Sequence, residues 1–368
     1  MQHTAMPPRK AEAGRDYPRG LLLQWHITER CNLRCTHCYQ DSHSAGTELT
    51  FAQLLAILEQ FLALLDAWGR LGAERPRGFI NLTGGEPLAH RALFDLLEVL
   101  SALRDRLAFG ILSNGTLIDA AAAGRLRELG TSNVQVSLDG SRPVHDGIRG
   151  AGSFDRALTG LRDLVEAGVN TVVSFTAHRS NYREFYEVAR TCREVGVTRV
   201  WADRLIPSGA GKGLSGLLLA PDETREFFEI MRRAREDFDN SDGPGGTEVS
   251  MGRALQFLIG GGSPYQCGAG SRLITVGANG DLFPCRRLPI KVGNLLETPL
   301  HELYYTSKVF AVLRSGANLA PECHRCEHAT TCRGGLRCLA YAVRGDPFAV
   351  DPGCWLPKST EGDEGHPA

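Results

Sequence analysis

The chain has 368 residues, 42% of them hydrophobic, which is enough to bury one large core and a smaller one. Its 41 basic and 42 acidic side chains give a net charge of -1, which argues against nucleic acid or an anionic membrane surface as the main partner. No apolar run approaches the roughly 20 residues that span a bilayer, and the N-terminus lacks the apolar segment of a secretory signal. We therefore expect a cytoplasmic protein with neither nucleic acid nor membrane as a partner.

Short apolar runs alternate with amphipathic helical patterns from about residue 20 to residue 207. The runs read LLLQWHIT, FINLT, AFGILS, NVQVSLD, TVVSFTA and RVWADRLI, and leucines repeat at helical spacing at 54–65 and 93–103. Six such units in series predict a parallel sheet with right-handed crossovers. Because six units are too few for a closed eight-stranded barrel, we expect an α/β fold, an open partial (β/α)6 barrel whose chemistry lies at the carboxyl ends of the strands.

The second half of the chain predicts a helix and then a small region rich in cysteine. Pro221 and Asp222 open the helix at 221–238, DNSDGPGG at 239–246 predicts a loop, and LITVGANGDLFPC predicts a hairpin with a tight Asn279-Gly280 turn. Such a small region needs metal cross-links to hold its shape. The expected parts are an N-terminal extension at 1–20, the barrel at 21–238, a linker at 239–262, a cysteine-rich domain at 263–358 and a tail at 359–368.

Eleven cysteines are the exceptional feature of the composition. Three lie within residues 31–38, seven lie within 267–354, and Cys192 stands alone. In a reducing compartment, clustered cysteines are more often metal ligands or catalytic groups than disulfides. The distribution predicts two metal-binding regions, whereas Cys192, on the apolar face of a predicted helix, is expected to be a core residue.

Cys31, Cys35 and Cys38 directly follow the first predicted strand, in TERCNLRCTHC. A 4Fe-4S cube normally takes four thiolates, so three local cysteines leave one iron for an exogenous ligand. A zinc or ferredoxin site is the alternative, which the missing fourth cysteine and the strand-end position disfavour. In this context CxxxCxxC resembles the signature of the radical S-adenosylmethionine (SAM) superfamily. The resemblance implies that SAM chelates the open iron and is cleaved to a 5′-deoxyadenosyl radical, with these three cysteines as the catalytic cluster ligands.

Short motifs after the other strands fall where that family contacts SAM. The glycines of TGGEP at 83–87 allow close backbone approach, and Glu86 is expected to accept a hydrogen bond from the SAM ammonium. SNG at 113–115 is expected to meet the ribose, and His37 takes the place of an aromatic residue near adenine. The implied cofactor-binding residues are His37, Gly84, Gly85, Glu86, Pro87, Ser113, Asn114, Ser137, Asp139, Arg149, Arg204 and Leu205.

The seven C-terminal cysteines resemble the SPASM extension of radical SAM peptide and protein maturases, which carries two auxiliary clusters. The gap from Cys332 to Cys338 is two residues longer than usual. The resemblance implies three 4Fe-4S clusters in all, with one auxiliary cube on Cys323, Cys326, Cys332 and Cys354 and the other on Cys267, Cys285 and Cys338. The three-cysteine set leaves an iron that is either open, and able to bind a substrate thiolate, or capped by another group. Structural zinc sites are the alternative.

The resemblance implies an enzyme that modifies a ribosomally made peptide, by a thioether or other cross-link or by epimerisation. Arg286 and Arg287 follow Cys285 where sulfatase maturases usually have an acidic residue, so that activity is disfavoured. With Lys291 they form a basic loop that could steer an acidic peptide; a solvated surface loop is the alternative. Implied partners are the peptide, a reductant such as flavodoxin or ferredoxin, and a separate leader-binding protein, because only about 20 residues precede the first strand. The alternatives are tailoring of a tetrapyrrole precursor and a non-catalytic iron–sulfur electron-transfer protein.

Overall fold

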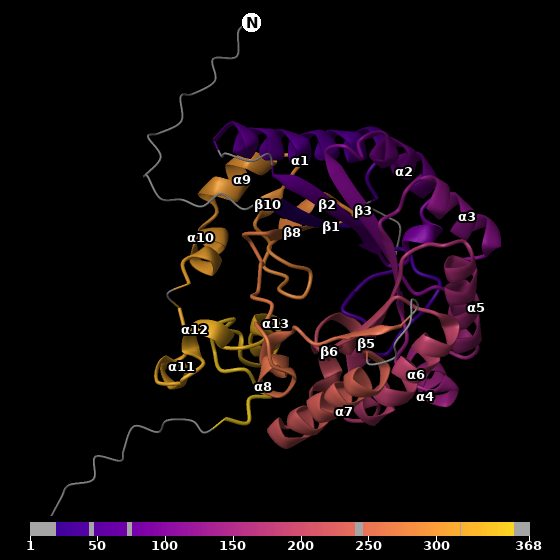
Figure 1. Cartoon of the computed structure of the whole chain (residues 1–368). Coiled ribbons are helices and arrows are strands. Elements are labelled where there is room, and N and C mark those ends of the chain that lie inside the picture. Colours follow the sequence, from indigo (N-terminus) through magenta and orange to yellow (C-terminus); the bar gives the residue numbers. More distant parts are fainter. Residues whose placement is uncertain (1–19, 44–47, 72–75, 240–245, 317, 357–368) are drawn as a thin grey trace, which may run out of the picture.

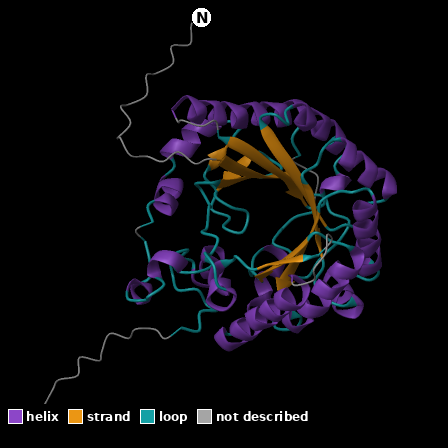
Figure 2. Cartoon of the chain, viewed as in Figure 1, coloured by secondary structure: helices purple, strands orange, loops and turns teal. Residues whose placement is uncertain are grey.

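The computed structural model describes residues 20–43, 48–71, 76–239, 246–316 and 318–356. Within these residues the strands form a single sheet in the order β10-β9-β8-β1-β2-β3-β4-β5-β6-β7. Figures 1 and 2 show the sheet curving inside an arc of helices, which leaves one side of the barrel open toward the C-terminal region. The expected extension before Gly20, the tail at 359–368 and residues 240–245 of the predicted loop lie outside the described residues.

Six parallel strands form the barrel, as the apolar runs predict. They are β1 (Gly20–Thr28), β2 (Arg77–Gly84), β3 (Leu107–Ser113), β4 (Asn133–Ser137), β5 (Thr171–Ala177) and β6 (Arg199–Arg204). Each pairs with the next in parallel. The predicted α/β fold, with a parallel sheet at its core, is confirmed.

Helices cover the outer face of this sheet. They are α1 (Phe51–Leu71), α2 (Leu93–Ala102), α3 (Ala120–Glu128), α4 (Arg142–Arg149), α5 (Ser153–Glu166), α6 (Phe185–Val195) and α7 (Pro221–Asp239), with 3-10 turns η1 (Pro87–Ala89), η2 (Tyr182–Glu184) and η3 (Gly209–Leu217). The predicted helix at 221–238 is therefore confirmed as α7. Cys192 on α6 is 1% exposed, and burial raises the pKa of its thiol, which confirms it as a core residue.

Helix α1 is long and apolar enough between Phe51 and Arg70 to cross a membrane, contrary to the expectation that no run approaches this length. Its apolar side packs against the outer face of the sheet instead, where Leu54, Ile57, Phe61, Leu64 and Trp68 are at most 1% exposed. Burial of five large side chains contributes roughly 1.5–3 kcal/mol each. Burial of this side against the sheet explains the high hydropathy of α1.

The sheet continues past the six predicted strands in both directions. Strand β7 (Glu248–Ser250) pairs in parallel with β6, and η4 (Ala254–Gln256) and α8 (Phe257–Gly260) follow it. Part of the stretch expected to be a linker at 239–262 is thus folded structure. On the other edge, β8 (Leu273–Val276) pairs in parallel with β1.

The predicted hairpin is present in the cysteine-rich region. Strand β8 pairs antiparallel with β9 (Asp281–Phe283), and β9 pairs with β10 (Gly293–Asn294). The helices α9 (Leu300–Thr306), α10 (Lys308–Arg314), α11 (Pro321–His324), α12 (Ala329–Cys332) and α13 (Arg337–Arg344) complete it. Helices α11 and α12 contribute no buried residue, so apolar packing does little to hold them.

Candidate active site

One cavity of about 360 Å³ lies at the carboxyl ends of the barrel strands. Two sets of three cysteines line it, although more than 200 residues separate them in the sequence; they are Cys31, Cys35 and Cys38, and Cys267, Cys285 and Cys338. Of the described residues, no three His, Cys, Asp or Glu side chains are arranged to hold a single metal ion. Both cysteine sets thus lie on the same cavity, which the open side of the barrel allows the C-terminal set to reach.

Each sulfur of the first set receives an N–H donor. The donors are the Asn114 amide toward Cys31 (3.8 Å), the Arg149 guanidinium toward Cys35 (3.9 Å) and the Gln40 backbone toward Cys38 (3.5 Å). Donors aimed at sulfur stabilise a thiolate, and they tune the potential of an iron–sulfur cluster. This donor set fits a cluster bound by three thiolates.

The protein by itself does not ionise two of these thiols. Burial raises the pKa of Cys31, and burial likewise raises the pKa of Cys38. A coordinating metal deprotonates a thiol outright. The thiolate form that the N–H donors would stabilise therefore requires metal binding. A 4Fe-4S cube with a free iron, held here, would supply an electron to the sulfonium of bound SAM.

The Gly84-Gly85 pair holds the cysteine loop against β2. The Gly85 and Glu86 amides donate to the carbonyls of Thr28 and Arg30 at 2.9 and 2.7 Å. A Cβ at Gly84 would overlap the Thr28 carbonyl, and one at Gly85 would overlap that of Arg30. Both glycines line the cavity, so they allow the cysteine loop to lie directly against its wall.

Glu86 lies behind the cavity wall instead of lining it. Its carboxylate accepts hydrogen bonds from the Ser113 hydroxyl and the Asn114 backbone N–H, both at 2.8 Å. Burial raises the pKa of Glu86 to about 7, against the opposing effect of these donors. The Glu86 carboxyl positions Ser113 and Asn114, which do line the cavity; the SAM-ammonium contact expected at Glu86 stays a prediction. Pro87 starts the η1 turn beside it.

A buried carboxylate also orients two cavity residues beyond β4. Arg149 donates from Nε to Asp139 at 2.6 Å, and His37 Nε2 lies 3.4 Å from the same carboxylate. Burial raises the pKa of Asp139, but the Arg149 charge and His37 outweigh it and hold the pKa at about 2. Burial lowers the pKa of His37 to about 4, so the ring is neutral. Asp139 thus fixes Arg149 and His37, which line the cavity together with Ser137.

Two ion pairs, one buried and one partly buried, join the end of β6 to the cysteine-rich region. Arg204 binds Asp351 through two hydrogen bonds of 2.7 Å, and Asp203 accepts from Arg287 at 2.6 Å. The guanidinium of Arg204, expected near the adenine and carboxylate of SAM, is thus already paired, whereas Leu205 lines the cavity. Sequence reasoning missed both aspartates, because no local signal reveals partners that lie 84 and 147 residues away.

The basic loop expected after Cys285 is largely neutralised. Besides the pairing of Arg287 with Asp203, Lys291 binds Asp281 at 2.7 Å. Arg286 lies over the ring of Tyr39 at 5.6 Å. Two of the three basic side chains of this loop are therefore paired, and the steering of an acidic peptide by the loop stays a prediction.

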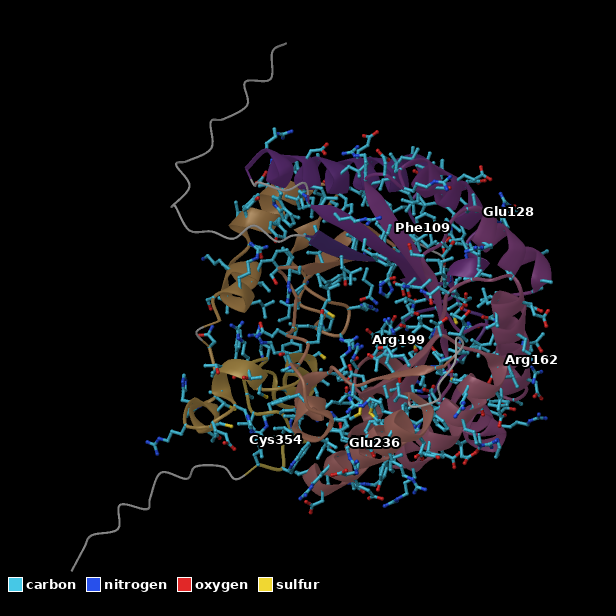
Figure 3. The ribbon with its side chains drawn as sticks, viewed as in Figure 1. Phe109, Glu128, Arg162, Arg199, Glu236 and Cys354 are labelled. Atoms are coloured by element: carbon cyan, nitrogen blue, oxygen red, sulfur yellow. The ribbon has the colours of Figure 1, made fainter. Side chains whose placement is uncertain are left out.

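The other four cysteines of the C-terminal region surround a second, small cavity of about 30 Å³. Its lining includes Cys323, Cys326, Cys332 and Cys354 together with apolar side chains such as Leu255, Phe257 and Val350. Figure 3 shows Cys354 within this C-terminal part, apart from Phe109 in the sheet. Burial raises the pKa of Cys332 to about 12, and it also raises the pKa of Cys323 and Cys354, so these three thiols need a metal to ionise. Four thiols on one cavity fit the ligand set of a single cube.

An open α/β barrel with a three-cysteine loop at its strand ends and two further cysteine sets beside it defines an iron–sulfur enzyme. Family models match the radical SAM superfamily at residues 25–192 and a SPASM iron–sulfur cluster-binding domain at residues 267–327. The chain belongs to the radical SAM superfamily and carries a SPASM domain.

Relatives along nearly the whole length include enzymes of two kinds. The chain is 30% identical to an Fe-coproporphyrin III synthase of Methanosarcina barkeri, over 93% of this chain and 89% of that one. It is 28% identical to a PqqA peptide cyclase of Streptomyces rochei, over 92% and 90%. The solved structure of anSMEcpe with bound AdoMet and a peptide has a TM-score of 0.72 at 20% identity, covering 91% of this chain and 94% of that one, which shows the shared fold.

Proposed function

We propose that this enzyme cleaves SAM at the cluster of Cys31, Cys35 and Cys38 and uses the resulting radical to modify a ribosomally made peptide. The observation that carries the proposal is the shared cavity, which both three-cysteine sets line. A substrate residue held at the Cys267, Cys285 and Cys338 set would lie in the same space as SAM. The modification we propose is a thioether or other cross-link, or epimerisation.

The residues around the cavity suit SAM in chemically distinct ways. The Arg149 guanidinium could bind the carboxylate of SAM, since only its Nε donates to Asp139 and its Nη1 points toward Cys35 on the cavity wall. The neutral His37 ring suits contact with adenine, and the Gly84-Gly85 backbone allows close approach. We assign the second cavity, on Cys323, Cys326, Cys332 and Cys354, to a complete auxiliary cube, which makes three cubes in all.

A large substrate is supported by the position of Cys267. This cysteine is exposed and lines the cavity, so the auxiliary set reaches from the interior to the surface. The relative named as a peptide cyclase and the solved neighbour bound to a peptide are consistent with such a substrate. We further propose a cytoplasmic enzyme that draws electrons from a flavodoxin or ferredoxin, with a separate leader-binding protein.

Tailoring of a tetrapyrrole is the second candidate. The relative named Fe-coproporphyrin III synthase favours it, since it matches over nearly the same span as the peptide cyclase and at similar identity.

The test is anaerobic reconstitution followed by SAM cleavage in the presence of each substrate class. We expect 5′-deoxyadenosine together with a mass change in a peptide encoded beside the gene, and no change in an iron coproporphyrin. Modification of the porphyrin alone would contradict the peptide proposal. Absence of 5′-deoxyadenosine from the loaded, reduced enzyme would contradict SAM cleavage itself.

A variant separates the roles of the two sets. Cys267→Ala is expected to reduce product formation more than SAM cleavage, because the cysteines of the first set are unchanged. Cys192→Ala is the matched control, since it removes a buried thiol that lines neither cavity.

A further inference from the structure

Arg253 projects a cation into the active-site cavity between two aromatic rings. Its guanidinium lies 4.6 Å from the ring centroid of Trp201 and 4.9 Å from that of Tyr265. All three residues line the cavity, beside Cys267 and Cys285. Contact with aromatic faces holds a guanidinium in place while its N–H edge stays available for hydrogen bonds.

Arg253 forms no ion pair with an acidic side chain within the described part of the chain, although its charge acts on Asp203. The other arginines of this cavity are each paired: Arg149 with Asp139, Arg204 with Asp351 and Arg287 with Asp203. The positive charge of Arg253 contributes to lowering the pKa of Asp203, but the Asp203 carboxylate already accepts from the Arg287 guanidinium and the Arg204 amide. Arg253 is thus the one arginine in the described lining of this cavity that no ion pair neutralises.

The backbone that carries Arg253 is held firmly. The Arg253 amide donates to the Gln256 side chain at 2.9 Å, and that side chain donates to the Ala202 carbonyl of β6 at 3.0 Å. The next residue, Ala254, has a φ of +23°, a conformation that L residues rarely adopt and that persists only where the surroundings impose it. A rigidly mounted, unpaired cation is typical of a site that binds an anion.

We propose that Arg253, flanked by Trp201 and Tyr265, binds a carboxylate of the substrate and so sets the position of the substrate between the two cysteine sets. The proposal rests on the proposed function and names a specificity-determining residue for it. A planar guanidinium binds a carboxylate through two parallel hydrogen bonds. The carboxylate has two sources that fit this chemistry, an acidic side chain or C-terminus of a peptide and a propionate of a tetrapyrrole.

The test measures binding rather than turnover. Equilibrium dialysis of the reconstituted enzyme with SAM compares two matched pairs of probes: a short Glu-containing peptide with its Gln counterpart, and coproporphyrin III with its tetramethyl ester. In the unchanged chain we expect the acid member of one pair to bind about 10-fold or more tightly than its neutral counterpart, and which pair shows this identifies the source. Arg253→Gln is expected to bring that ratio close to one, and Arg253→Lys to restore part of it.

The matched control is Arg162→Gln, which removes the same charge from the exposed outer face of α5 (Figure 3) and is expected to keep the ratio. The proposal is wrong if neither acid probe is preferred, or if Arg253→Gln keeps the preference. It is also wrong if that variant loses iron while its remaining loaded chains keep the preference, since Arg253 would then serve the cluster at Cys285. SAM cleavage in the same samples tests the proposed function separately, because binding is measured whether or not turnover occurs.

Discussion

Replacement of Asp351 by Asn tests whether the buried ion pair with Arg204 holds the cysteine-rich region on the barrel. The side chains of Arg204 and Asp351 are 3% and 1% exposed. The Asp351 carboxylate also accepts from the Leu336 and Gly353 amides at 2.7 and 2.9 Å. It therefore organises the segments around Cys338 and Cys354 as well as neutralising Arg204.

The expected cost follows from the charge that remains. Removing one partner of a buried pair leaves the other charge uncompensated, which typically costs about 3–5 kcal/mol. Asn keeps one acceptor for the backbone donors, so we expect about 3 kcal/mol from Asp351→Asn, a large part of a total stability of roughly 5–15 kcal/mol. The loss falls on the segment that bears Cys354, so we expect loss of the cube of that set, about four irons per chain.

The assay is iron counting together with thermal unfolding of the anaerobically reconstituted enzyme. The control is Glu248→Gln, which breaks the Arg199–Glu248 pair of 2.8 Å, whose side chains are about half exposed; such a pair contributes at most about 1 kcal/mol. Adding Arg204→Met to Asp351→Asn should recover stability, because the unpaired charge is then gone. Full iron content and wild-type unfolding in Asp351→Asn would refute the reasoning.

Further predictions concern single residues of the site. Glu86→Gln should gain stability relative to the wild type as pH rises from about 4.5 to 7, by roughly 3 kcal/mol in denaturant titrations. The reason is that the raised pKa of Glu86 makes the native carboxyl bind a proton that the unfolded chain has released, so wild-type stability falls across that range; parallel pH profiles would contradict it. Gly335→Ala should lower the unfolding temperature more than Gly345→Ala. Both glycines have positive φ, but a Cβ at Gly335 would overlap the Asp351 carboxylate whereas one at Gly345 meets open space. Equal shifts would refute that contact.

The arrangement of the first cysteine set could be predicted because it depends on local order along the chain. Parallel strands taken in sequence bring their carboxyl ends to one edge, so the segments around Cys31, Gly84, Asn114 and Arg149 had to meet there. The roles within that edge were harder to assign. The sequence predicts Glu86 as a SAM contact, which stays a prediction, but it did not show that the Glu86 carboxylate accepts hydrogen bonds from Ser113 and Asn114.

Features that depend on distant contacts could not be read in advance. Strand β7 has three residues, too few for a periodic pattern, so Arg253 lay in a stretch interpreted as a linker. Asp351 stands in a turn-like DPGC segment that shows no sign of a partner on β6. The pairing of Arg287 with Asp203 likewise depends on the tertiary fold, which brings the loop after β9 next to the end of β6. Composition suggested a basic loop, but tertiary structure paired most of its charge.

Formation of 5′-deoxyadenosine by the anaerobically reconstituted, reduced enzyme tests the central claim most directly. The wild type is expected to form it from SAM, and Cys31→Ala, Cys35→Ala and Cys38→Ala are each expected to form none, whereas Cys192→Ala forms it at the wild-type rate. The account is contradicted if the wild type carries its full iron content and yields no 5′-deoxyadenosine, or if any of the three variants continues to produce it.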